Sequence, residues 1–287
     1  MSKTVTIGNK KATVSPFASW MTVFVLVPMA LVVYYAFTNA DGAFTFENLK
    51  WIYTYRSTMF LSLRLAFIAT VICLLLAYPI AYSMSRAGEK IQRNATLIIM
   101  LPMWMNFLVR TYSWMTILEN NGLINSALRS IFGLFGGEFD GFQLINNRGA
   151  IVLGMVYNFL PYMILPIYTS LTKIDNSLLE AARDLGSNGF HVFKRVILPL
   201  SIPGIISGIT MVFIPSISTF IISRILGGGK DFLIGDLIED YFLGNSGVVN
   251  YNIGAALSMV LMILILIATF FMNHFDKDAK TSGGGRI

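Results

Sequence analysis

Residues 177–200 read SLLEAARDLGSNGFHVFKRVILPL, a polar and charged stretch between two long apolar segments. Its charges make it a poor membrane span, because charged side chains are costly at the centre of a bilayer. Its helix start and stop signals also distinguish it from a simple connector. The stretch is therefore expected to be a structured element outside the membrane.

The rest of the chain has the composition of an integral membrane protein. Of its 287 residues, 55% are hydrophobic and 13% are charged, and the mean hydropathy is +0.67, whereas about 25% of residues are charged in a typical soluble domain. The net charge of +6 would point to nucleic acid in a soluble domain. In a membrane chain the placement of Lys and Arg is more informative, so no nucleic acid partner is expected.

Residue types that build metal or catalytic sites are scarce. Cys73 is the single cysteine, in an apolar run, and His191 and His274 are far apart in sequence. We interpret Cys73 as a small buried hydrophobe and expect no metal site and no catalytic residues. The run Gly227–Lys230 is not a phosphate loop, because Asp231 stands where Ser or Thr is required. The chain is expected to bind no cofactor and not to be an enzyme.

Six apolar windows are long enough to cross a bilayer, which requires about 20 mainly apolar residues in a helix. We interpret the first as a retained span, because its apolar stretch is longer than that of an ordinary signal peptide. The sequence thus predicts one all-helical transmembrane domain over residues 1–287. The windows cover residues 17–38, 60–85, 95–118, 149–172, 201–223 and 251–274.

The basic residues predict the orientation of these windows. With both termini in the cytoplasm, thirteen Lys and Arg residues lie on that side and six on the other, as expected from the excess of positive charge in cytoplasmic loops. This orientation places residues 173–200 in the cytoplasm. The thirteen are Lys3, Lys10, Lys11, Arg86, Lys90, Arg93, Lys173, Arg183, Lys194, Arg195, Lys277, Lys280 and Arg286.

A first short helix is expected to begin at Ser177. Ser177 and Glu180 have the spacing of a capping box, and Gly186 stands where a helix commonly ends. The small residues Ala181 and Ala182 would let another surface approach closely. For Glu180, a helix cap and a partner contact remain alternatives.

A second short helix is expected over residues 188–197. It would carry Phe190, Phe193 and Ile197 on one face. Pro199 would stop it before the fifth window, because proline lacks the N–H that a helix interior requires. The sequence thus predicts two short helices that protrude into the cytoplasm, each with an exposed apolar face.

These residues resemble the EAA loop of the membrane subunits of ABC importers. The resemblance rests on Glu180-Ala181-Ala182, on Gly186 and on Leu198-Pro199, with Val196 where the family often has Ile. In that family the loop docks into a groove of a separate ATPase subunit and transmits its closure to the spans. The resemblance therefore implies a coupling loop over residues 173–200. Its residues are Glu180, Ala181, Ala182, Asp184, Gly186, Phe190, Leu198 and Pro199.

Further blocks are similar to the spermidine/putrescine branch of these permeases, of the B type. They are Pro161-Tyr162-Met163 with Pro166, Ser170-Leu171, and Leu226-Gly227-Gly228 with Leu233-Ile234-Gly235. The resemblance implies a type I importer fold, alternating access, and a bacterial cytoplasmic membrane as location. It also implies a second related permease subunit, a pair of ATPase subunits that use ATP and Mg, and a soluble extracytoplasmic binding protein.

Two other functions remain open. One is import of a different small solute, such as an anion or iron, by the same kind of machine. The other is an ion-coupled secondary transporter, which would require buried acidic residues, and none lies well inside the six windows.

The fifth window contains a candidate substrate path. Pro215 is followed by Ser216, Ser218, Thr219 and Phe220, and transporters often place substrate sites at broken helices. Hydroxyl oxygens and aromatic faces suit ammonium groups. The alternative is a packing kink whose hydroxyls bond back to their own helix. The candidate aromatic residues are Trp104, Tyr157, Tyr162 and Phe220.

An acidic segment follows the fifth window and contains Asp231, Asp236, Glu239 and Asp240. Three of these would share one side of a helix and could attract a polycation at the entrance. A solvated face, or a docking surface for a binding protein, is the alternative.

Two arginines lie inside the predicted spans. Arg110, in the third window, would repel a cation unless it is paired, so we expect it to reach the outer surface, to form an ion pair or to hold a gate shut. Arg64, near the start of the second window, is interpreted as an interfacial anchor.

Overall fold

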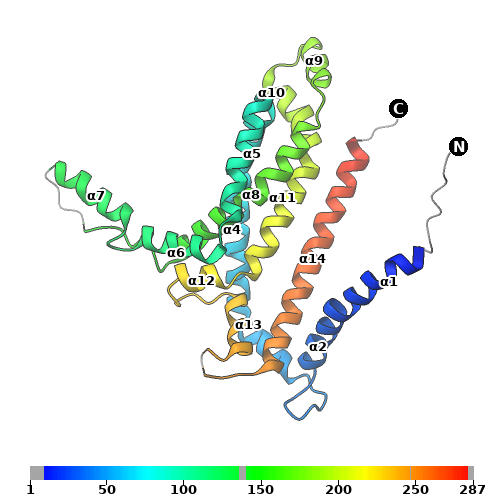
Figure 1. Ribbon diagram of the computed structural model, residues 1–287, viewed down its shortest axis with the longest axis vertical. Coiled ribbons are helices and arrows are strands. Elements are labelled where there is room, and N and C mark those ends of the chain that lie inside the picture. The colour runs from blue at the N-terminus through cyan, green and yellow to red at the C-terminus, as the bar shows by residue number, and fades with distance from the viewer. Residues whose placement is uncertain (1–9, 136–139, 246, 284–287) are drawn as a thin grey trace. The chain divides into compact units, whose positions relative to one another are not determined.

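The computed structural model describes residues 10–135, 140–245 and 247–283. Within these ranges the chain is helical apart from loops and one isolated β-bridge between Thr38 and Phe44 (Figure 1). The predicted all-α class is therefore confirmed. Lys3 and Arg286, which were counted for the orientation, lie outside the described residues.

The described α-helices vary from 4 to 33 residues in length, and the shortest helical element is a 3-10 helix of 3 residues. In chain order the elements are α1 (Lys10–Met21), the π-helical η1 (Thr22–Leu26), α2 (Val27–Ala36), the 3-10 helix η2 (Glu47–Leu49), α3 (Lys50–Thr54), α4 (Arg56–Arg86), α5 (Glu89–Trp104), α6 (Phe107–Leu118), α7 (Leu123–Leu134), α8 (Arg148–Thr172), α9 (Asn176–Asp184), α10 (Gly189–Val192), the π-helical η3 (Phe193–Ile197), α11 (Leu198–Ser218), α12 (Ile221–Leu226), α13 (Ile234–Leu243) and α14 (Tyr251–Gly283).

Five described helices are long and apolar enough to cross a membrane, or up to six if a bent pair counts as one span. The five overlap the predicted windows 17–38, 60–85, 149–172, 201–223 and 251–274. Their bounds are Ser15–Ala36, Arg56–Arg86, Arg148–Thr172, Gly189–Ser218 and Tyr251–Met272.

The predicted window 95–118 is divided between two helices, which give the sixth span if the bent pair counts as one. The chain bends by 91° between α5 and the segment formed by α6 and α7. Pro102 lies in the last turn of α5, and Met105 and Asn106 then adopt extended backbone conformations. The Asn106 side chain restarts the helix, because its Oδ1 accepts from the Leu108 N–H at 2.8 Å.

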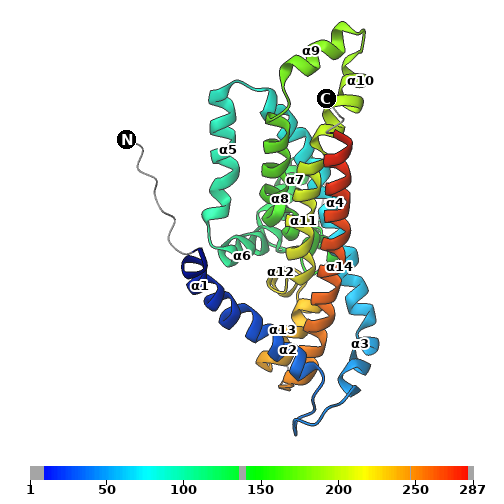
Figure 2. The same cartoon turned by 90° about the vertical axis from the view of Figure 1, so that its right-hand side faces the viewer.

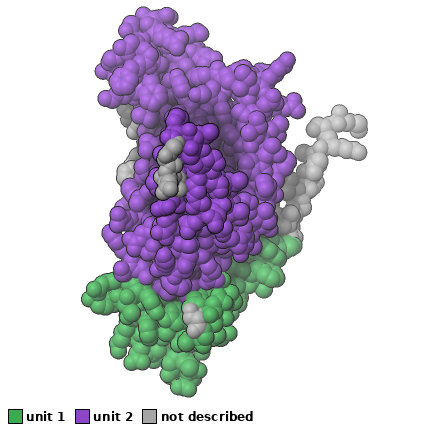
Figure 3. Space-filling model, turned by 90° about the vertical axis from the view of Figure 1, so that its left-hand side faces the viewer, with its two compact units in different colours: residues 1–56, 238–263 green, residues 57–237, 264–287 purple. Residues whose placement is uncertain are grey.

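The described chain divides into two compact units, coloured separately in Figure 3. Unit 1 comprises residues 1–56 and 238–263, and unit 2 comprises residues 57–237 and 264–287. The single transmembrane domain over residues 1–287 stays a prediction.

In unit 1, two asparagine side chains donate hydrogen bonds to backbone carbonyls at and just after the end of α2. Asn48 Nδ2 donates to the carbonyl oxygens of Ala36 at 3.1 Å and Thr38 at 2.8 Å. Asn252 Nδ2 donates to the Thr38 carbonyl at 2.6 Å. The last carbonyls of a helix have no partner within the helix, so these amides hold the turn after α2 and join it to the start of α14.

Unit 2 is organised around α8 and α11, which lie side by side (Figures 1 and 2). Glycines on α11 allow the close approach. A Cβ on Gly204 would lie 2.5 Å from Ser170 Cβ, and one on Gly208 would lie 2.7 Å from Met163 Sδ. The closely packed pair is the framework on which the candidate functional site is built. Large side chains of α8 that are fully buried are Ile151, Met155, Met163, Ile167 and Leu171.

Candidate functional site

The coupling loop begins with a helix cap at Asp175. The Asp175 carboxylate accepts from the Ser177 N–H at 3.0 Å, and α9 begins at Asn176. This bond lowers the pKa of Asp175. The predicted capping box is wrong, because the capping residue is Asp175, two residues before Ser177. Glu180 is therefore not needed as a cap.

The predicted end of the first helix is confirmed at Gly186. Gly186 has a φ of +79°, a left-handed conformation that favours glycine. Its N–H donates to the Arg183 carbonyl at 2.8 Å, and the Ser187 N–H donates to the Ala182 carbonyl at 3.1 Å. These two bonds form a Schellman motif, which turns the chain sharply toward α10.

The second helix begins as predicted but continues into the fifth span. Asn188 caps α10 by accepting from the His191 N–H at 2.9 Å. The helix then widens into a π-turn over Phe193–Ile197 and runs on into α11. Pro199 does not stop it, because the Leu198 N–H bonds to the Phe193 carbonyl across the π-turn and proline is tolerated in the first turn that follows.

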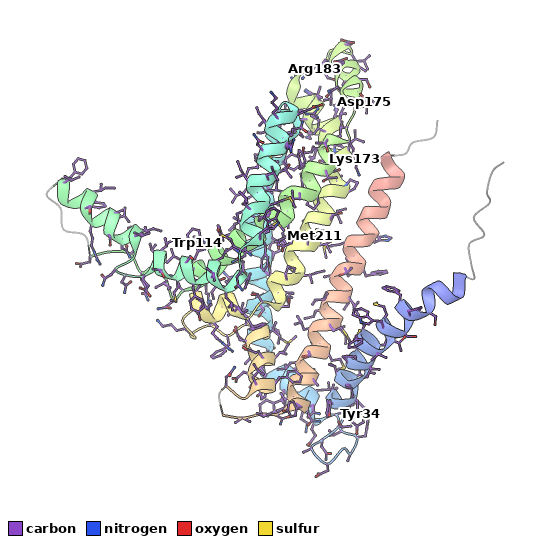
Figure 4. All side chains as sticks on the ribbon, in the orientation of Figure 1. Tyr34, Trp114, Lys173, Asp175, Arg183 and Met211 are labelled. Atoms are coloured by element: carbon purple, nitrogen blue, oxygen red, sulfur yellow. The ribbon has the colours of Figure 1, made fainter. Side chains whose placement is uncertain are left out.

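The surface of the loop presents apolar side chains to solvent. Leu185 is 87% exposed, Phe190 69% and Leu178 50%. The predicted docking residues Glu180, Ala181, Asp184, Gly186 and Pro199 are also exposed, while Ala182 and Leu198 are half-buried. Figure 4 shows Lys173, Asp175 and Arg183 together at this end of unit 2. Exposed apolar side chains among charges are typical of an interaction surface.

Aromatic contacts join the loop to the neighbouring span. The Phe193 ring lies edge-on to Tyr78 and Tyr82 of α4, with centroids 5.8 and 6.1 Å apart. Tyr78 Oη and Ser201 Oγ are 3.0 Å apart and link α4 to α11. The loop is thereby attached to the spans by packing and by a polar bond.

A polar pocket of about 380 Å³ lies under α9. Arg86, at the end of α4, donates from Nη1 to Asn176 Oδ1 at 3.0 Å. Glu180 and Arg183 line the same pocket. The sequence analysis did not propose Arg86 or Asn176 as site residues. The one signal in the sequence was that Arg86 is a cationic residue directly after the apolar window 60–85.

A larger groove of about 800 Å³ runs along α8 and α11. Apolar side chains and several hydroxyl groups form its walls, with one cation, Lys173, at the end near the coupling loop. Met211, farther along α11, is labelled in Figure 4. Of the four predicted aromatics, Tyr162 lines this groove. Its other polar lining residues are Thr169, Ser170, Lys173 and Ser207.

The structure does not bring the other predicted aromatics together with Tyr162. Trp104 is 75% exposed at the end of α5. Tyr157 packs against Trp114 of α6, with ring centroids 5.2 Å apart. Phe220 is 36% exposed and precedes α12.

The predicted break at Pro215 lies elsewhere. The helix α11 continues through Pro215 to Ser218, and the interruption falls at Thr219 and Phe220. Ser218 Oγ bonds back to the Ile214 carbonyl at 3.1 Å, which is the alternative anticipated for these hydroxyls. Ser216 and Thr219 are buried. This part of the candidate path is therefore packed inside unit 2.

The acidic segment is not an open row of carboxylates. Asp231 forms a forked ion pair with Arg148, whose Nη2 lies 2.8 Å from Asp231 Oδ1. Asp236 is only 2% exposed, and its Oδ2 accepts from the Leu233 N–H at 2.8 Å. Glu239 and Asp240 are half-buried on α13. Asp236 was expected at a surface, but it is buried in the first turn of α13, where it accepts from the N–H of the residue before that helix.

The two arginines of the predicted spans differ in environment. Arg64 is exposed on α4, and its interpretation as an interfacial anchor stays a prediction. Arg110 is only 6% exposed, so it does not reach the surface. Its Nε and Nη1 have no hydrogen-bond partner among the described residues, and its guanidinium lies 5.9 Å from the Phe107 ring centroid.

Comparison with known proteins places this architecture in a family. Residues 77–281 match the family described as "Binding-protein-dependent transport system inner membrane component". The chain belongs to this family. The match covers α8, the coupling loop and α11, so the groove and the loop are parts of a permease.

Two curated permeases are similar over nearly the whole chain. The spermidine/putrescine transport system permease protein PotB of Haemophilus influenzae is 38% identical over 281 residues, covering 94% of this chain and 96% of the relative. PotB of Escherichia coli K12 is 34% identical, covering 86% and 90%. The similarity therefore covers most of this chain and most of each relative.

A solved structure shares the fold. A chain of a bacterial ABC transporter for the import of alginate superposes with a TM-score of 0.76 at 19% identity, covering 93% of this chain and 94% of that chain. At this identity the likeness concerns the fold alone. It confirms the predicted type I ABC importer permease fold.

Proposed function

We propose that this chain is a permease subunit of an ATP-driven importer of polyamines. The observation that carries the substrate class is the 38% identity to PotB over 94% of this chain and 96% of the relative. Because the similarity includes the membrane segments and the coupling loop, substrate passage and energy coupling are both attributed to this chain.

The groove along α8 and α11 forms one wall of the translocation path. Tyr162 offers an aromatic face, and Thr169, Ser170 and Ser207 offer hydroxyl oxygens. Such groups bind ammonium groups through cation–π contacts and hydrogen bonds. Lys173 lies at one end of the groove, and its positive charge repels a bound cation there. This repulsion favours passage of the substrate through the groove over tight binding at that end.

ATP hydrolysis takes place on partner subunits. A pair of ATPase subunits, which use ATP and Mg, docks on the exposed surface around Leu178, Leu185 and Phe190. Their closure moves α9 and α10, and with them the continuous helix that leads into α11. The permease itself binds no cofactor and is not an enzyme in this proposal.

The other partners complete a binding-protein-dependent importer. A second related permease supplies the opposite wall of the path, and a soluble extracytoplasmic protein delivers the substrate. A solved relative of this fold is named as an alginate ABC transporter in complex with a pentasaccharide-bound periplasmic protein. The chain lies in a bacterial cytoplasmic membrane with both termini in the cytoplasm, an orientation supported by its basic residues.

Uptake of labelled spermidine and putrescine tests the substrate class. The gene is deleted in cells without another polyamine importer and then restored as wild type. Loss on deletion and recovery on restoration are expected. Unchanged polyamine uptake would refute the assignment, and parallel uptake of anions and iron would then identify the solute.

Gentle detergent extraction tests the energy source. The permease is expected to co-purify with an ATPase whose activity rises when substrate and binding protein are added. Uptake that continues without any such ATPase would instead indicate an ion-coupled secondary transporter.

A further inference from the structure

The guanidinium of Arg86 is only partly engaged. Its Nη1 donates to Asn176 Oδ1 at 3.0 Å, whereas its Nε and Nη2 are buried and have no hydrogen-bond partner among the described residues. Tyr82 lies below, with the guanidinium carbon 5.8 Å from the ring centroid. Arg86 as a whole is half-buried, but two buried N–H donors without an acceptor cost free energy, which a ligand on this side of Arg86 would offset.

The open side of Arg86 has the geometry of a carboxylate site. The Nε–H and one Nη2–H of an arginine point in the same direction and bind two carboxylate oxygens at once. The same chain shows this arrangement at Arg148, where Nε lies 3.1 Å from both oxygens of Asp231 and Nη2 lies 2.8 Å from one of them. Arg86 presents the same pair of donors without the acid.

One carboxylate lies in the same pocket. Glu180 lines it together with Arg86, Asn176 and Arg183. Asn176 and Glu180 are four residues apart on α9 and so lie one above the other on one helix face. Asn176, which already accepts from Nη1 of Arg86, is thus one helical turn away from Glu180. Glu180 is the only carboxylate among the described residues that line the pocket.

We infer that Arg86 is a positioning residue that binds the Glu180 carboxylate through Nε and Nη2 while Asn176 remains on Nη1. The two bonds hold one face of α9 against the end of α4 at two successive turns. A rotation of α9 that brings Glu180 inward closes the pocket on this side. The inference rests on the proposed coupling role of the loop, and its consequence is that movement of α9 is passed directly to α4.

Arg183 is the natural comparison within the pocket. It lies three residues after Glu180 on α9, so a bond between them would remain within one helix and would not reach α4. An acidic side chain of an ATPase subunit is the other possible ligand of Arg86. The experiment must separate these three pairings.

Carbodiimide crosslinking of the complete transporter provides this separation. The variant Arg86→Lys places an amine at the end of α4, and carbodiimide joins an amine to a carboxylate in contact with it by an amide bond. Mass spectrometry is expected to find a peptide that links position 86 to Glu180, and the link should vanish in Arg86→Lys combined with Glu180→Gln. A link from position 86 to an ATPase subunit, or no link at all, would overturn the inference.

A double-mutant cycle on uptake gives a second and independent reading. Arg86→Gln and Glu180→Gln are expected to lower uptake by the same factor, and their combination should lower it no further. Arg183→Gln combined with Glu180→Gln should instead multiply the two separate losses. Multiplying losses for the Arg86 pair, at unchanged membrane levels, would contradict the inference.

The two tests also separate this inference from the proposed function. The crosslink is detected without transport, so it can be found even if the transported solute is not a polyamine. Conversely, polyamine uptake with no link between position 86 and Glu180 would refute the role of Arg86 alone.

Discussion

Gly204 of α11 lies directly against Pro166 of α8: a Cβ added to Gly204 would be 2.7 Å from the Pro166 carbonyl oxygen. That oxygen belongs to the backbone and cannot rotate away. The contact fixes the spacing of the two helices that form the groove.

Gly204→Val is therefore expected to destabilise the permease by about 1–3 kcal/mol, the usual cost of overpacking a closely packed contact. Thermal unfolding in detergent, followed by loss of monodisperse protein, measures this. The matched control is Gly133→Ala on α7, where an added Cβ meets nothing within 4 Å. Equal stability of the Gly204 variant and the wild type would show that α8 and α11 can move apart freely.

Gly186→Leu is expected to reduce coupled ATP hydrolysis and uptake while leaving the membrane level near normal. The reason is conformational, because no atom lies within 4 Å of a Cβ at this position while a left-handed backbone costs an ordinary residue about 1–2 kcal/mol. Asn tolerates this conformation better than Leu, so Gly186→Asn should keep more activity. If both variants transport like the wild type, the turn is not part of the coupling.

Asp175 is expected to give the start of α9 a dependence on pH. The Ser177 N–H that bonds to its carboxylate lowers the pKa of Asp175 below its ordinary value of 3.8. The cap is therefore fully present above that value and is lost as the pH falls through the lowered pKa. Hydrogen exchange of the first α9 amides, taken relative to their intrinsic exchange rate at each pH, should accelerate in this acidic range.

Asp175→Asn serves as the control for that experiment, since its amide oxygen caps a helix without titrating. Its exchange should keep the same degree of protection across the range. Asp175→Ala should lack protection at every pH. Acid-induced acceleration of equal size in the Asn variant would assign the effect to another group.

The groove predicts which polar residues affect substrate affinity. Tyr162→Leu is expected to raise the KM of polyamine uptake severalfold, since a cation–π contact contributes about 0.5–2 kcal/mol. Ser218→Ala should change it little, because Ser218 bonds to its own helix. Trp104→Leu, at a 75% exposed position outside the groove, is the aromatic control. An unchanged KM for Tyr162→Leu would remove the groove from the path.

Local signals in the sequence predicted several features of the fold. Apolar length located five of the spans, and Gly186 correctly predicted the end of α9. In the third window, hydropathy alone does not reveal the bend between α5 and α6, although Pro102 and Asn106 both signal an interruption. Hydropathy and helix-interrupting residues thus make opposite predictions for the same segment, and the sequence alone does not show which of them the folded chain follows.

The site was less accessible from the sequence than the fold. Asp175 and Ser177 are both good cap residues, and the sequence alone does not choose between them, whereas the structure shows Asp175 as the cap. The groove depends on the contact of α8 with α11, so Thr169 and Ser207 carry no distinguishing mark in the sequence. Arg86 and Asn176 are 90 residues apart and become neighbours only when α4 and α9 are placed in space.

The π-turn over Phe193–Ile197 has a mechanical consequence for the whole segment. It keeps Gly189–Ser218 a single helix of 30 residues, which corresponds to a rod of about 45 Å. In the proposed coupling, a push at Phe190 would be delivered along the axis to Ser218 instead of being absorbed by a hinge at Pro199. The proposed coupling would then place the bend at Gly186 and use the membrane helix as the long arm of a lever.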